Sequence, residues 1–120
     1  KQKEVYNTVL KAQLAVIEQI KAGMTGVEAD KIARDIIKEA GYGDNFGHGL
    51  GHGIGVEVHE GPTASYKSND TIIEGSVVTD EPGIYIKGWG GVRIEDDLLI
   101  TKDGCEVLNS SPKELIEVPV

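Results

Sequence analysis

The sequence is poor in several features that mark other classes of protein. Its 120 residues include one cysteine, Cys105, which cannot form an internal disulfide and which we expect to be a bystander in a hairpin connection. Basic residues are also few, with 12 Lys and Arg against 20 Asp and Glu, and the formal net charge is -8. A field of this sign repels polyanions, so the composition argues against binding to DNA or RNA.

Long hydrophobic runs are absent as well. No stretch reaches the roughly 18 apolar residues that a membrane-spanning segment needs. The first residues, Lys1–Glu4, are not followed by the apolar core of a signal peptide. We therefore expect no membrane association and a cytoplasmic location. The length fits one domain at most, large enough to bury a core.

Two amphipathic helices are predicted in the first third of the chain. Between residues 4 and 22, apolar side chains recur at spacings of three and four. They are Val5, Val9, Ala12, Val16 and Ile20. Thr25 and Glu28 form a capping-box pattern that begins a second helix, which ends at Gly41. Its expected buried stripe is Ala29, Ile32, Ala33, Ile36, Ile37 and Ala40.

After residue 41 the hydrophobic period changes from helical to alternating. Residues 62–70 are predicted to form a polar surface loop. Strands are expected around Val56 and Val58 and at residues 76–79, 84–86, 92–94, 98–101, 105–108 and 115–118. This order predicts an α+β fold with the helices packed on one face of a largely antiparallel sheet.

Histidine occurs only in one glycine-rich stretch, which begins His48-Gly-Leu-Gly-His52 and ends Val58-His59-Glu60. A neutral imidazole binds divalent transition metals and also serves as a general acid or base. Carboxylates follow at Glu81 and Glu95, which we expect at the mouths of neighbouring strands, where His52 can face them. Taken singly, such acids are typical of solvated surface.

One histidine and two glutamates suit a divalent ion such as Mn, Co, Fe or Zn, and a glutamate can bridge two ions. Two ions roughly 3.5 to 4 Å apart would activate water near neutral pH and polarise a carbonyl, which is a route to peptide hydrolysis. Two divalent ions carry more positive charge than two glutamates neutralise. The site therefore requires two further carboxylates, which this chain does not obviously contain.

Four motifs occur in order along the chain. They are His48-Gly-Leu-Gly-His52-Gly-Ile-Gly, Val58-His59-Glu60-Gly-Pro62, Glu81-Pro-Gly-Ile-Tyr85 and Gly91-Val-Arg93-Ile-Glu95-Asp96. Together they resemble the proline-specific aminopeptidase and dipeptidase family, which has the pita-bread fold of methionine aminopeptidase and creatinase. The resemblance extends from the first helix to the last strand. It implies hydrolysis of the bond between an N-terminal residue and proline by a dinuclear metal centre.

The resemblance also implies a role for each matching residue. His52 and Glu81 would bind one ion, and Glu95 would bridge both. His48 and His59 would contact the substrate and stabilise its tetrahedral intermediate, and Arg93 would support the metal-binding residues from behind. Mn or Co are the expected metals, with Zn or Fe as alternatives. Tyr85, at the end of its motif, is assigned to the core.

The two glutamate motifs distinguish branches of the family. Gly83 and the Arg93-Ile-Glu95-Asp96 string resemble the Xaa-Pro branch, whereas methionine aminopeptidases typically have methionine after Glu-Pro. Creatinase, which needs no metal, fits less well because both Glu81 and Glu95 are present. A methionine aminopeptidase-like enzyme and a catalytically silent binding module of the same fold remain the alternatives.

The family's two other metal ligands are aspartates on an earlier hairpin, and nothing before His52 matches them. Asp30 and Asp35 lie on a predicted helix, and Asp44 is alone. We therefore expect residues 1–120 to be the C-terminal half of a catalytic domain that belongs to a longer protein. Alone, this half would bind one ion weakly or none, and would lack useful activity.

Three partners follow from this interpretation. The first is a peptide substrate with proline at its second position, and the second is the missing N-terminal part of the same protein. The third is a second copy of the chain, because the surface that should meet the other half would be left open and two copies could pair about a twofold axis.

Overall fold

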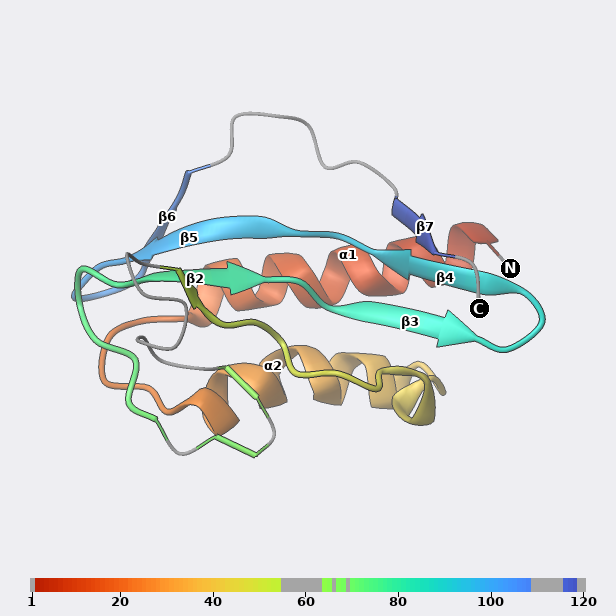
Figure 1. Cartoon of the computed structure of the whole chain (residues 1–120), viewed down its shortest axis with the longest axis horizontal. Coiled ribbons are helices and arrows are strands. Elements are labelled where there is room, and N and C mark those ends of the chain that lie inside the picture. The colour runs from red at the N-terminus through yellow and green to blue at the C-terminus, as the bar shows by residue number, and fades with distance from the viewer. Residues whose placement is uncertain (1, 55–63, 66, 69, 109–115, 119–120) are drawn as a thin grey trace.

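The chain forms a layer of short strands and a pair of helices. The computed structural model describes residues 2–54, 64–65, 67–68, 70–108 and 116–118. The helices are α1 (Gln2–Gln19), α2 (Gly26–Glu39) and the 3-10 turn η1 (Gly43–Asn45). The strands are β1 (Gly53–Ile54), β2 (Val77–Asp80), β3 (Gly83–Ile86), β4 (Gly90–Arg93), β5 (Asp96–Ile100), β6 (Cys105–Val107) and β7 (Ile116–Val118). Figure 1 shows α1 running along the strands, with α2 beside it.

Helix α1 packs its apolar stripe against the strands and against α2. All five predicted apolar positions, from Val5 to Ile20, are buried. The helix extends from Gln2 to Gln19, close to the predicted span. In the part of the chain that the structure describes, no helix is both long enough and apolar enough to cross a membrane.

Helix α2 begins with the predicted capping box. The Thr25 side chain accepts a hydrogen bond from the amide of Glu28, and the Glu28 carboxylate accepts one from the amide of Thr25. Most of the predicted stripe is buried or partly buried. The prediction for Ala40 is wrong, because the helix ends at Glu39 and Ala40 is an exposed C-cap beyond the packed face.

The described residues of the connection between β1 and β2 include one that packs more closely than the sequence suggests. The prediction of a surface loop at residues 62–70 is wrong at Ala64, which is fully buried. The carbonyl of Asp70 accepts a hydrogen bond from the amide of Gly26 at 2.8 Å, because the first amides of a helix need acceptors outside it. The strand expected at Val56 and Val58 lies outside the described residues.

The strands form two antiparallel ladders, ordered β1-β2-β5-β6 and β3-β4-β7. Strand β2 leads into β3, and β4 leads into β5, so that each ladder continues into the other (Figure 1). The described strands therefore confirm the predicted antiparallel α+β arrangement, with the sheet divided where the chain passes between ladders.

A buried hydrogen bond connects α1 to the start of β5, where the chain enters the β1-β2-β5-β6 ladder. Gln13 is fully buried, and its Nε2 donates to Oδ2 of Asp96, the first residue of β5, at 2.5 Å. Asp96 is itself 3% exposed and pairs with Asp80 across the ladder. A hydrogen bond to a buried carboxylate contributes more than one between neutral groups. The contact therefore fixes the start of β5 relative to the helix.

Gln13→Met keeps a side chain of similar length but removes the amide donor. We expect the free energy of unfolding to fall by about 1.5–3 kcal/mol, because the buried Asp96 carboxylate loses a charge-assisted hydrogen bond. Urea denaturation followed by circular dichroism measures this change. Gln19→Met, at the exposed end of the same helix, is the control and should cost less than about 0.5 kcal/mol. Equal losses in both variants would contradict the assignment.

Candidate active site

Glu81 and Glu95 lie at the two places where the chain passes from one ladder to the other. Each is flanked by the last pair of β2 with β5 and the first pair of β3 with β4. These pairs are Asp80↔Asp96 and Gly83↔Arg93. Because both ladders share one register, Glu81 lies opposite Glu95 between them. Residues opposite each other on antiparallel strands project to the same face, so the backbone brings both glutamates to one junction.

The stretch that carries His52 runs along β2. The amide of His52 donates to Oγ1 of Thr79, and the His52 carbonyl accepts from the Thr79 amide, both at 2.9 Å. The amide of Glu81 donates to the carbonyl of Leu50 at 2.9 Å. A Cβ on Gly51 would lie 1.8 Å from the Thr79 carbonyl oxygen, so only glycine permits this approach. Backbone contacts therefore fix His52 beside Glu81.

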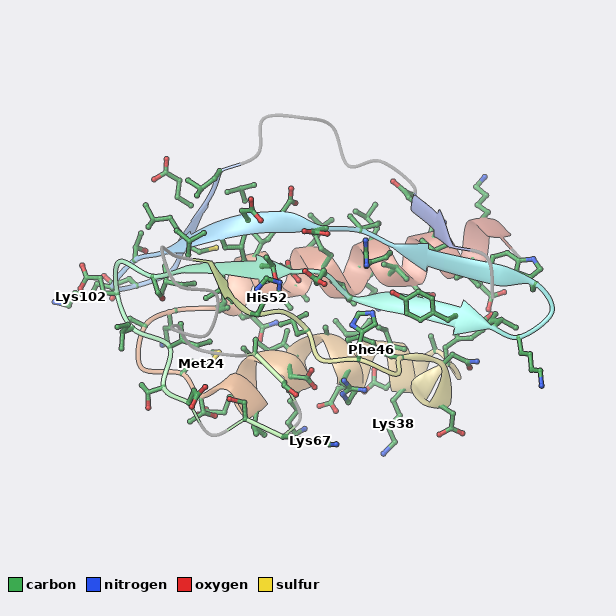
Figure 2. All side chains as sticks on the ribbon, in the orientation of Figure 1. Met24, Lys38, Phe46, His52, Lys67 and Lys102 are labelled. Carbon is green, nitrogen blue, oxygen red and sulfur yellow. The ribbon has the colours of Figure 1, made fainter. Side chains whose placement is uncertain are left out.

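The side chains of His52 and Glu81 form a pair, with 3.9 Å between Nε2 and Oε2. Nδ1 of His52 lies 3.1 Å from the carbonyl of Gly53, and because a carbonyl only accepts, this contact places the proton on Nδ1. Nε2 then carries a lone pair. The imidazole is 61% exposed, and Figure 2 shows His52 near the middle of the strands. A lone pair beside a carboxylate and open to solvent suits a divalent ion.

A cavity of about 460 Å³ opens at this pair. Its lining residues are His48, Gly49, Gly51, His52, Ser65, Glu81 and Arg93. Four of them, His48, His52, Glu81 and Arg93, were predicted from the sequence as site residues, although they come from three separate segments. The structure thus places two predicted metal ligands, one predicted substrate residue and the predicted supporting arginine around one space.

Glu95 is not among the described residues that line this cavity. Its Oε1 lies 3.9 Å from Nη2 of Arg93, two residues earlier on the same chain segment. Within the described ranges, no group of three or more His, Cys, Asp or Glu side chains is placed to hold a metal ion. The side chains therefore form two pairs, His52 with Glu81 and Arg93 with Glu95.

Tyr85 belongs to this site, and its assignment to the core is wrong. Its hydroxyl lies 2.7 Å from Nε2 of His48. Nδ1 of His48 is 2.7 Å from the carbonyl of Gly49, which requires a proton on Nδ1 and leaves Nε2 to accept from the tyrosine. Side chains alternate along a strand, so Glu81, Gly83 and Tyr85 follow the period of one face. That spacing is the sequence signal that identifies Tyr85.

The Tyr85 ring occupies space that glycine leaves open. A Cβ on Gly91, its partner across the β3–β4 ladder, would lie 2.5 Å from Cδ1 of the ring. Burial raises the pKa of Tyr85 above its ordinary value of 10.0, the charge of Arg93 opposes this effect, and Glu81 adds to it. The hydroxyl is therefore protonated at neutral pH and can donate to His48.

Two further predictions concern His59 and Cys105. His59 lies in the segment 55–63, outside the described residues. Cys105 donates its thiol to the carbonyl of Ile17 at 3.3 Å, and burial, followed by the charge of Asp80, raises its pKa above 9.0. A thiol held in its protonated form is a poor nucleophile, which agrees with a bystander role.

Imidazole, carboxylate and guanidinium groups thus lie around one open cavity. Residues 1–102 match metallopeptidase family M24. The chain therefore belongs to this family, and its fold is half of the pita-bread fold predicted from the sequence. M24 membership implies divalent metal ions.

Similar proteins of known name support the Xaa-Pro branch. The chain is 53% identical over 116 residues to an Xaa-Pro dipeptidase of Pyrococcus furiosus, covering 97% of this chain and 33% of that protein. A solved Xaa-Pro dipeptidase from Bacillus anthracis superposes with a TM-score of 0.89 at 58% identity, over 95% of this chain and 32% of that one.

An X-Pro aminopeptidase from Thermotoga maritima gives a TM-score of 0.87 at 49% identity, over 93% of this chain and 32% of that one. The chain thus spans about a third of the length of the curated relatives that it matches. Relatives named for both dipeptidase and aminopeptidase activity share its fold.

Gly51→Ala places a methyl group against the Thr79 carbonyl. We expect it to lower the free energy of unfolding by about 1–3 kcal/mol and to separate the histidine stretch from β2. Urea denaturation measures the first effect, and faster hydrogen exchange at the Glu81 amide measures the second. Gly47→Ala is the matched control, because a Cβ there meets nothing within 4 Å. Unchanged exchange in Gly51→Ala would show that the close approach is unimportant.

Proposed function

We propose that residues 1–120 are the C-terminal half of the catalytic domain of an Xaa-Pro peptidase, supplying His52, Glu81 and Glu95 to a centre of two divalent ions. One observation carries this proposal. The Nε2 of His52 lies 3.9 Å from Glu81 Oε2, in a cavity that His48 and Arg93 also line. The relatives named Xaa-Pro dipeptidase support a peptide substrate with proline at its second position.

The donor set fits the proposed ions. An imidazole nitrogen with carboxylate oxygens suits Mn, Co, Zn or Fe, and we favour Mn or Co. When bound, two such ions polarise a carbonyl and lower the pKa of water. Glu95 lies opposite Glu81 at the junction of the ladders, where a shared ligand is required. The two further carboxylates that balance the charge come from the part of the longer protein outside this chain.

The other residues of the cavity hold the substrate in place. His48 lines the cavity, and its Nε2 accepts from Tyr85, so the tyrosine fixes the ring orientation and its tautomer. Substrate binding at Nε2 would exchange this contact for one to the peptide. Arg93 interacts with both the Tyr85 hydroxyl and Glu95, and its charge offsets the negative charge of the carboxylate. The role of His59 is carried over from the resemblance alone.

The partners of the chain follow from the same proposal. The main partner is the N-terminal part of the longer protein, which completes the centre. In its absence, we expect a second copy of the chain to cover the surface that the missing part would meet. A cytoplasmic location remains a prediction from composition.

Replacing the matched third of the Pyrococcus furiosus Xaa-Pro dipeptidase with this chain tests the activity. We expect the chimera to hydrolyse an Xaa-Pro dipeptide in the presence of Mn²⁺ or Co²⁺. Glu81→Gln and Glu95→Gln should each lower kcat/KM by more than about 100-fold, beyond the loss typical of residues that only support ligands. Steady-state kinetics at a fixed metal concentration measures the activity of the chimera and the kcat/KM of each variant.

Glu106→Gln is the matched control for the chimera. It removes an exposed carboxylate from β6, in the same ladder as β2 and β5, and should leave kcat/KM unchanged. A folded chimera that cleaves N-terminal methionine but not the Xaa-Pro bond would favour the methionine aminopeptidase alternative. A folded chimera without any peptidase activity would favour a silent binding module.

The isolated chain should bind Mn²⁺ weakly, as a single ion or not at all, because its ligands supply only part of the charge that two ions require. Isothermal titration calorimetry of the chain, compared with the active chimera, measures the difference. Tight binding of two ions by the chain alone would refute the proposed division of ligands. Sedimentation of the same sample reports pairing, and a monomer at every concentration rejects the second copy as a partner.

A further inference from the structure

Asp30 and Arg34 form a partly buried ion pair one turn apart on α2. Nε of Arg34 donates to Oδ2 of Asp30 at 2.6 Å, and Nη2 donates to Oδ1 at 3.2 Å. The Asp30 side chain is 1% exposed and that of Arg34 is 23% exposed. A buried ion pair is weak evidence for stability, because the loss of hydration offsets much of the attraction. The role of the pair is therefore indicated by the hydrogen bonds that Asp30 and Arg34 make to other residues.

Those hydrogen bonds go to the backbone that carries His48. Nη1 and Nη2 of Arg34 donate to the carbonyls of Phe46 and His48, both at 2.8 Å. Oδ1 of Asp30 accepts from the amide of Leu50 at 3.0 Å. The pair thus binds the backbone at every second residue of the segment 46–50, through the carbonyls of Phe46 and His48 and the amide of Leu50.

The same pair reaches the His48 ring through an aromatic contact. The Arg34 guanidinium lies 4.1 Å from the centroid of the Phe46 ring, and Phe46 is 2% exposed. The Phe46 and His48 rings meet edge to face, with centroids 5.1 Å apart and planes at 87°. Figure 2 shows Phe46 in the region between α2 and the strands. On its other side, His48 receives the Tyr85 hydroxyl.

We propose that Asp30 and Arg34 are positioning residues, which hold the segment 46–50 so that the His48 imidazole, which lines the cavity, meets the Tyr85 hydroxyl. The fork of the guanidinium is required, since it binds a carboxylate and two carbonyls at once. A lysine ammonium is a point charge and cannot hold this planar arrangement. The placement of His48 stands on the contacts alone, and its effect on catalysis rests on the proposed peptidase function.

Arg34→Lys and Asp30→Asn test the proposal, and the Lys31–Asp35 pair supplies the controls. Lys31 and Asp35 have the same spacing on the same helix, but their side chains are 67% and 49% exposed. Lys31→Gln and Asp35→Asn therefore remove equivalent charges without touching the segment 46–50. Asp30→Asn is the milder variant, because its amide oxygen can still accept from Leu50.

The first measurement is the nitrogen NMR spectrum of the His48 ring in the isolated chain at fixed pH. We expect the Nε2 resonance to move toward that of a free neutral imidazole in Arg34→Lys and Asp30→Asn, reporting the loss of the Tyr85 hydrogen bond. The control variants should give the spectrum of the original chain. Tyr85→Phe supplies the reference shift for an imidazole without that donor.

The second measurement is the activity of the chimera described above. We expect a fall in kcat/KM of about 10- to 100-fold in Arg34→Lys, as is typical when a residue that orients a functional group is lost. Affinity for Mn²⁺ should be little changed, because the pair does not contact His52, Glu81 or Glu95 in any described hydrogen bond.

The NMR and kinetic measurements together distinguish failure of the positioning role from failure of the proposed peptidase function. An Arg34→Lys chain that is less stable but keeps the original His48 resonances overturns the proposal, since the pair would then support only the fold. If Arg34→Lys does not fold, the same comparison is made on Asp30→Asn. An inactive parent chimera with shifted His48 resonances in the variants leaves the positioning role standing and rejects the peptidase function.

Discussion

The shared register of the two antiparallel ladders is the constraint on which the site depends. Neither glutamate lies within a described strand, yet the pairs on either side of the junction leave Glu81 and Glu95 opposite each other. The histidine stretch then follows the edge of β2 through the backbone of Thr79 and Glu81. A shift of one residue in either ladder would turn these side chains to the other face. The strand pairing therefore sets where the cavity lies, and the side chains then determine its chemistry.

Local patterns in the sequence predict much of this structure. The period of the apolar residues gives both helices, and Thr25 with Glu28 gives the start of α2. The motifs also select most of the cavity, since His48, His52, Glu81 and Arg93 line it. These predictions succeed because each depends on spacing within one segment or on a motif whose residues act together. The sequence also predicts that Glu95 converges with His52 and Glu81. Among the described residues, the Glu95 carboxylate lies near Arg93, and the three proposed ligands do not form one cluster.

What the sequence does not reveal depends on contacts between distant segments. The Tyr85 hydroxyl meets His48 from a strand far along the chain. The alternation that puts Tyr85 on the same face as Glu81 does not by itself reveal this contact. The Asp30 and Arg34 spacing is common on exposed helices, where such a pair contributes little. Only the burial of Asp30 and the carbonyls that Arg34 meets distinguish it from the exposed pair beside it. Tertiary packing thus decides which of two identical sequence spacings has a role.

The space above Gly91 has a consequence for reading related sequences. The phenol ring at position 85 can be large only because its cross-strand neighbour has no side chain, so the two positions constitute a single steric unit. In a relative that keeps this backbone, a bulkier residue at 91 requires a smaller one at 85, and the hydroxyl that orients the imidazole disappears with it. The residue at 91 therefore serves as a marker for whether a homologous site retains a tyrosine-oriented histidine.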